Sequence, residues 1–151
     1  MATVVRASVF GVSGFVLAYL IVSARGRIGD WWPLVGASGL AAFSVSLLLW
    51  RLLCGSGQPV SGRRGALAGA LTGLLAHPIA WYLALVWHYL QRHTSSLGDK
   101  PVDPLQSFAG SLVMAFWSLL IAGWLTVPAG AIVGFLLTSS RNGRTIRCSP
   151  W

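Results

Sequence analysis

Long stretches without charged residues dominate the chain. No Asp, Glu, Lys or Arg occurs in four windows, which are residues 7–24, 31–50, 65–91 and 104–140. The windows contain 18, 20, 27 and 37 residues, and a helix needs about 20 apolar residues to cross about 30 Å of hydrocarbon. The pattern therefore predicts an all-α, polytopic integral membrane protein with four transmembrane helices.

Helix boundaries follow from the window edges and from the turn residues between them. We expect a single transmembrane domain over residues 1–151, with a basic tail at 140–151 and helices at about 5–24, 31–53, 64–92 and 106–139. Short connections place consecutive helices side by side and antiparallel, which predicts an up-down-up-down bundle.

Composition agrees with a membrane protein and argues against a soluble domain. Hydrophobic residues make up 55% of the chain, charged residues 9%, and the mean hydropathy is +0.70. The excess of 11 basic over 3 acidic residues lies in short clusters at window edges, so we interpret it as topological charge and expect no nucleic-acid binding.

The basic residues also predict an orientation. One side carries seven of them, which are Arg6, Arg51, Arg63, Arg64, Arg141, Arg144 and Arg147. The other side carries four, which are Arg25, Arg27, Arg92 and Lys100. The positive-inside rule then favours a multi-pass protein of a bacterial-type inner (plasma) membrane with both termini in the cytoplasm, and with Arg141, Arg144 and Arg147 on anionic headgroups.

The first window has a second interpretation. Arg6, the apolar stretch after it and the small residues Val22-Ser23-Ala24 also resemble a secretory signal peptide with a cleavage site. We favour a retained helix over residues 1–24, and amino-terminal sequencing of the mature protein distinguishes the two.

Aromatic residues near the window edges resemble interfacial anchors. On this interpretation Trp50 marks the cytoplasmic interface. The corresponding residues at the external interface are Tyr19, Trp31, Trp32, Trp87 and Tyr89.

The fourth window is too long for one straight span, because 37 residues form a helix of roughly 55 Å. We expect residues 105–111 to form an interfacial turn and the spanning helix to start near Leu112. A bend is expected at Pro128, which lacks a backbone N–H donor.

The clearest local motif is a run of glycines spaced four apart. Gly65, Gly69 and Gly73 form a glycine groove on the third predicted helix, and Gly130 and Gly134 form a second pair on the fourth. Such spacing permits close backbone approach between helices in lipid. We favour packing of the two sets against each other, and self-association is the alternative.

His77 is the main candidate for chemistry, because it lies near the predicted bilayer midplane, where polar groups are costly. We group it with Trp81, Thr126 and Pro128 as a possible midplane polar site. The first interpretation is that it serves only as an interhelical link, donating to a carbonyl freed by a proline or to a hydroxyl of Ser46, Ser118 or Thr126. The second is that it lines a pathway or ligand pocket, and the third is that His77 and His88 ligate haem or chlorophyll with help from another helix or subunit.

No catalytic motif accompanies these residues. The sequence contains no phosphate-binding loop, H-E-x-x-H, G-x-S-x-G or C-x-x-C, and no carboxylate lies inside a window to support proton coupling. We expect no metal, no resident cofactor and no enzymatic activity. The leading hypothesis is an accessory or assembly subunit, or a small homo-oligomer, that acts through helix packing in the bilayer. The alternative is a transporter or channel-like protein with a pathway at His77.

Overall fold

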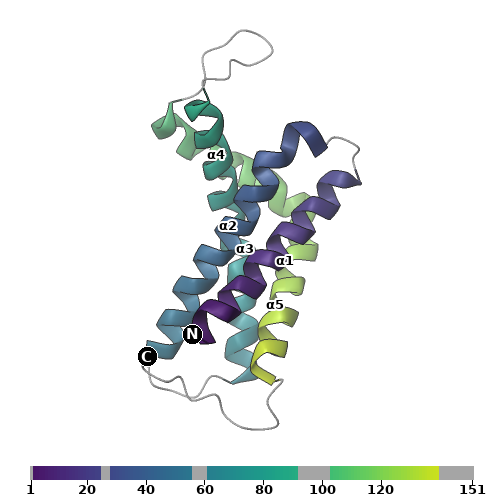
Figure 1. The fold of residues 1–151 in the computed structure, drawn as a ribbon, viewed down its shortest axis with the longest axis vertical. Helices are drawn as coiled ribbons and strands as arrows, with labels where there is room; N and C mark the ends of the chain where they lie inside the picture. Colours follow the sequence, from purple (N-terminus) through teal and green to yellow (C-terminus); the bar gives the residue numbers. More distant parts are fainter. Residues whose placement is uncertain (1, 25–27, 56–60, 92–102, 140–151) are drawn as a thin grey trace.

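The computed structural model describes residues 2–24, 28–55, 61–91 and 103–139, and every regular element within these ranges is helical. The elements are α1 (Ala2–Ser23), α2 (Ile28–Gly55), α3 (Gly62–Leu90), α4 (Pro104–Ser118), the π-helix η1 (Leu119–Gly123) and α5 (Trp124–Ser139) (Figure 1). Four segments are long and apolar enough to cross a membrane, which are Thr3–Ser23, Trp31–Leu53, Gly62–Leu90 and Pro104–Ser139. The prediction of an all-helical chain with four such segments is confirmed.

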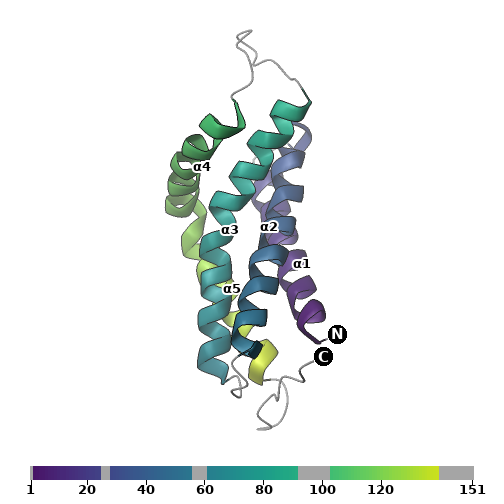
Figure 2. The same cartoon turned by 90° about the vertical axis from the view of Figure 1, so that its left-hand side faces the viewer.

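The helices form an elongated bundle around α3. The start of α1, the end of α2, the start of α3 and the end of α5 lie toward one end of the bundle, at the bottom of Figure 1. α1 packs along α2, and α3 contacts α2, α4 and α5. Figure 2 shows α4 on the opposite side of α3 from α1. Within the described residues, α3 is therefore the helix that joins the α1–α2 pair to the α4–α5 segment.

The fourth segment begins differently from the sequence expectation. Residues 105–111 are helical rather than an interfacial turn, so that expectation is wrong. α4 starts at Pro104, directly after Asp103, and proline fits the first turn of a helix because its missing N–H has no intrahelical partner there. Ser107, Ser111 and Ala115 are buried on α4, and their spacing of four places them on one face.

The irregularity in the fourth segment lies at η1, upstream of Pro128. Pro128 is inside α5, so the carbonyl of Trp124, four residues earlier, lacks its usual donor. The π-helix spans Leu119–Gly123, immediately before Trp124. The Trp124 indole N–H donates to the carbonyl of Ile121 within η1, at 2.8 Å. Kinks in helices commonly occur at prolines and at π-helical turns, and here the two occur within one short stretch.

Trp50 is buried in the core of the bundle, whereas an anchor is expected to expose its ring on the outer surface. Its side chain is 1% exposed and packs with Phe10, with Leu53, Val133 and Leu137 packed around the pair. The Arg6 guanidinium lies 4.9 Å from the centre of the Trp50 ring, a cation–π contact. Trp50 is buried because helices α1 and α5 both cover this part of α2.

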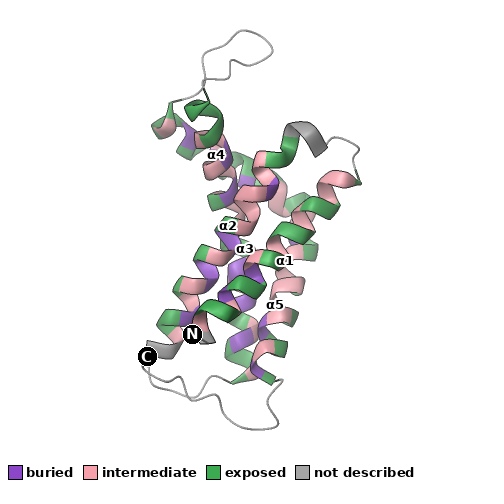
Figure 3. Ribbon diagram, viewed as in Figure 1, coloured by how far each residue is buried: buried purple, intermediate pink, exposed green. Residues whose placement is uncertain are grey.

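Large apolar side chains cover much of the outer surface. Exposed positions occur on every helix (Figure 3) and include Leu105, Phe116, Trp117 and Trp124. A soluble monomer rarely presents so much continuous apolar surface, so the outer surface is compatible with a membrane helical bundle.

Candidate functional site

Glycine groove residues bring the backbones of α3 and α5 together. A Cβ built on Gly69 would overlap the carbonyl of Gly130, and one built on Gly134 would overlap the carbonyl of Gly65. A Cβ on Gly73 would lie 2.7 Å from the carbonyl oxygen of Thr126. No side chain larger than hydrogen fits at these positions without separating the helices. The glycine groove is therefore filled by α5 of the same chain.

A second glycine contact, between α1 and α2, was not anticipated from the sequence. A Cβ on Gly14 would lie 2.8 Å from the Cβ of Ala42, and one on Gly39 would lie 3.2 Å from the carbonyl oxygen of Gly11. The available signal was Gly11-x-x-Gly14 on α1 and Gly39-x-x-Ala42 on α2. Its spacing of three is less distinctive than the spacing of four on α3, although both permit close helix approach.

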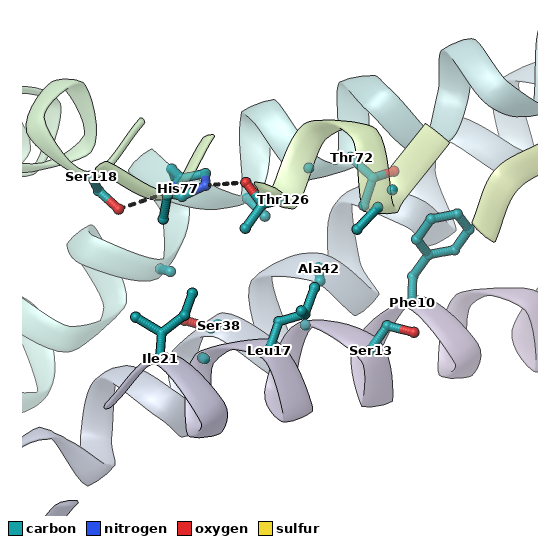
Figure 4. A pocket seen from close by; sticks show the side chains of 18 of the residues that line it. Phe10, Ser13, Leu17, Ile21, Ser38, Ala42, Thr72, His77, Ser118 and Thr126 are labelled. Atoms are coloured by element: carbon teal, nitrogen blue, oxygen red, sulfur yellow. Dashed lines mark hydrogen bonds between the residues drawn. The ribbon is translucent and has the colours of Figure 1, made fainter. Parts of the chain in front are cut away.

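His77 connects α3 to both sides of η1. Its Nδ1 lies 2.8 Å from the Ser118 hydroxyl at the end of α4, and its Nε2 lies 2.9 Å from the Thr126 hydroxyl on α5 (Figure 4). In a neutral imidazole one ring nitrogen donates and the other accepts. Each hydroxyl can complement either role, so both tautomers satisfy the pair. The sequence had named both hydroxyls as possible partners of His77.

A cavity of about 170 Å³ lies beside this hydrogen-bonded group. Figure 4 shows α1 side chains on one wall, facing His77 and Thr126 across the space. Residues that line it include Phe10, Ser13, Leu17 and Ile21 from α1, Ser38 and Ala42 from α2, Thr72 and His77 from α3, and Thr126 and Ala129 from α5. Its lining is mainly apolar, and all four of the long apolar segments contribute to it.

Three of the five hydroxyl groups in the cavity wall donate to helix backbones, and the other two, those of Ser118 and Thr126, bond to His77. Ser13 donates to the Val9 carbonyl, Ser38 to the Leu34 carbonyl and Thr72 to the Ala68 carbonyl, each at 2.8 Å. These bonds satisfy the donors without a ligand, as is common for Ser and Thr within helices. A molecule in the cavity therefore meets few groups that are ready to donate a hydrogen bond.

Of the other predicted site residues, some line the cavity and some lie away from it. Trp81 lines it and makes an edge-to-face contact with Trp31, with ring centres 6.1 Å apart. Pro128 is exposed on α5 and does not line it. His88 is exposed near the end of α3, 11 residues beyond His77. The structure thus brings together His77, Trp81 and Thr126, but neither Pro128 nor His88.

Metal or tetrapyrrole binding finds little support in this geometry. Both ring nitrogens of His77 already have hydroxyl partners, so axial ligation of haem or chlorophyll would break one of these bonds. Among the described residues, no group of three or more His, Cys, Asp or Glu side chains lies close enough to hold a metal ion.

Several predicted contacts fall on residues that the structure does not describe. The tail residues Arg141, Arg144 and Arg147 lie outside the described residues, as do Arg25, Arg27, Arg92 and Lys100. No family model, curated protein or solved structure matches this chain.

Proposed function

We propose that the chain is a non-enzymatic integral membrane protein that binds a ligand within the bilayer, in the cavity beside His77. The proposed topology is up-down-up-down in a bacterial-type inner membrane, with both termini in the cytoplasm. Its support is the distribution of basic residues. Arg51 near the end of α2, and Arg63 and Arg64 at the start of α3, fit the cytoplasmic end under the positive-inside rule.

The cavity is the observation that carries this proposal. Close-packed protein interiors contain few voids larger than a water molecule. A space of about 170 Å³ is comparable to an engineered cavity of about 150 Å³ that accepts benzene. Its walls come from segments far apart in the sequence, so the affinity for a ligand there depends on how the helices of the bundle are arranged.

A hydrated pathway past His77 is less well supported than ligand binding. Ions and polar solutes need groups that replace their hydration. The hydroxyls of Ser13, Ser38 and Thr72 instead donate to helix carbonyls, and His77 is held by two further hydroxyls. The cavity therefore offers an apolar molecule more favourable contacts than it offers an ion.

Native mass spectrometry of protein extracted gently from its own membranes tests ligand binding. We expect a species heavier than the bare chain by one bound small molecule. Ala129→Leu places a larger side chain on the cavity wall and is expected to remove the added mass. Ala109→Leu makes the same change at an exposed position of α4 and is expected to retain it. If the unmodified protein is detected only at the mass of the bare chain, the proposal is contradicted.

Assembly with another membrane subunit or a second copy is the second candidate. The glycine groove no longer supports it, because α5 fills that surface. The observation in its favour is α4, which packs on α3 but makes no comparable contact with α1 or α2 within the described residues. Its outward side chains Phe108 and Phe116 are each 60% exposed. Copurification from native membranes, compared between the unmodified protein and Phe116→Ala, tests this candidate. An identical set of copurifying subunits, or none, would count against it.

A further inference from the structure

Resting on the ligand-binding function above, we propose that the cavity holds part of one hydrocarbon chain of an anionic phospholipid, which enters from the bilayer between α1 and α5. The inference combines the chemistry of the cavity wall, the direction in which the cavity runs, and the charge at one end of the bundle. Each of these narrows the class of molecule that fits.

The cavity wall selects for hydrocarbon. Three of its hydroxyls donate to helix carbonyls, and those of Ser118 and Thr126 bond to the two ring nitrogens of His77. A polar ligand would therefore exchange its hydration for few hydrogen bonds, and each amide or hydroxyl group left without a partner costs on the order of 2–7 kcal/mol. A hydrocarbon chain pays no such cost, because it arrives from lipid that is already apolar.

Cavity shape favours a linear occupant aligned with the helices. On α1 the lining residues run from Phe10 to Val22, which at 1.5 Å per residue spans roughly 18 Å along the helix axis. That is more than half of the roughly 30 Å hydrocarbon thickness of a bilayer. The volume of about 170 Å³ holds only part of an acyl chain, so the chain would lie partly in the cavity and partly in the bilayer, parallel to the chains of neighbouring lipids.

The route of entry follows from helix contacts. α1 packs along α2 and α5 packs along α3, whereas α1 and α5 meet at only a few positions. The two helices that face each other across the cavity thus pack against each other far less than α1 packs against α2 or α5 against α3. A lipid chain can pass between them without breaking the glycine contacts that hold α3 to α5.

Charge at the Phe10 end of the cavity favours an anionic headgroup. Arg6 precedes Phe10 by four residues and so lies one turn away on the same face of α1. Arg51, Arg63 and Arg64 lie near the same end of the bundle, at the end of α2 and the start of α3. Clustered basic residues at a membrane surface attract acidic lipids by about 1 kcal/mol each.

Lipid titration followed by native mass spectrometry tests the inference. Delipidated protein is mixed with phosphatidylglycerol or with phosphatidylcholine that carries the same acyl chains. We expect one phosphatidylglycerol per chain, bound at least tenfold more tightly than phosphatidylcholine. Ala129→Leu is expected to weaken this binding at least tenfold, and Ala109→Leu to leave it unchanged. Ala18→Leu fills the cavity from the α1 wall and provides a second variant if Ala129→Leu fails to fold.

Each of four results would overturn the inference. Equal binding of the two lipids would refute the anionic headgroup, and equal binding by the Ala129→Leu and Ala109→Leu variants would put the lipid on the outer surface. In a third case, phosphatidylglycerol fails to bind, but protein from native membranes still carries a bound mass that Ala129→Leu removes. That result would refute the lipid alone and leave ligand binding intact. If phosphatidylglycerol does not bind and protein from native membranes carries no bound mass, the proposed function is refuted as well.

Discussion

One methyl group at Gly69 probes the contact between α3 and α5. The Cβ of an alanine there would overlap the carbonyl of Gly130 and lie 3.2 Å from the Cα of Gly134. These are backbone atoms, so no side-chain rotation relieves the overlap, and the two helices must separate. We expect Gly69→Ala to lower the free energy of unfolding by about 3 kcal/mol, at the upper end of overpacking costs. The better helix propensity of alanine, worth up to about 1 kcal/mol, offsets only part of the overlap.

Gly110→Ala is the matched control on α4. Its Cβ would meet only the Leu85 Cδ1 atom, at 3.8 Å, which is ordinary van der Waals contact. Without a clash, the helix-propensity gain of about 0.5–1 kcal/mol remains, so the two variants should differ by about 4 kcal/mol. Equilibrium unfolding in mixed micelles of sodium dodecyl sulfate and a mild detergent, followed by circular dichroism, measures this difference. Stabilities of Gly69→Ala and Gly110→Ala within about 1 kcal/mol of each other would refute the close-contact argument.

Further predictions concern the hydrogen bonds of His77 and the buried side chain of Trp50. His77→Ala should cost about 0.6–1.7 kcal/mol for each hydrogen bond lost, and adding Ser118→Ala and Thr126→Val to it should cost little more, because the shared bonds are already gone. The losses in the free energy of unfolding are measured for His77→Ala, for the two hydroxyl substitutions and for all three together. If the losses add fully, the hydroxyls act independently of His77. Trp50→Ala should cost about 3–5 kcal/mol, since the side chain is 1% exposed, whereas Trp32→Ala at 59% exposure should cost less than about 1 kcal/mol. Comparable losses for the two tryptophans would contradict the placement of Trp50 in the core.

Local sequence patterns predicted four long apolar helices and the main glycine contact. The absence of charge over four long windows is the pattern expected where burying a charge in hydrocarbon is costly. Gly65, Gly69 and Gly73 share one helix face, so their partnership with another small-residue surface could be inferred before any tertiary structure was known. The hydroxyl partners of His77 were also among the candidates considered, because buried polar groups require partners wherever they lie.

Features that depend on the relative placement of helices were missed. Trp50 has the sequence context of an interfacial anchor, and it is buried only because α1 and α5 pack around it. The π-helix at Leu119–Gly123 has no recognisable hydrophobic pattern in the sequence. The bend was therefore predicted at Pro128, because proline is known to disturb a helix. The cavity is a property of the space between the four long apolar segments, and no single window encodes it.

The π-helix also has a consequence for the register of the fourth segment. An α-helix advances by about 100° per residue, and a π-helical turn accommodates extra chain within one turn. A regular helix one residue shorter would therefore cover nearly the same rotation between α4 and α5. Ser107 and Ser111 on α4 and Gly130 and Gly134 on α5 would still lie on the faces they present now. Deleting one residue from Leu119–Gly123 should thus preserve both small-residue faces, whereas deleting one residue elsewhere in α4 or α5, where the helix holds no extra residue, should rotate one face by about 100° relative to the other.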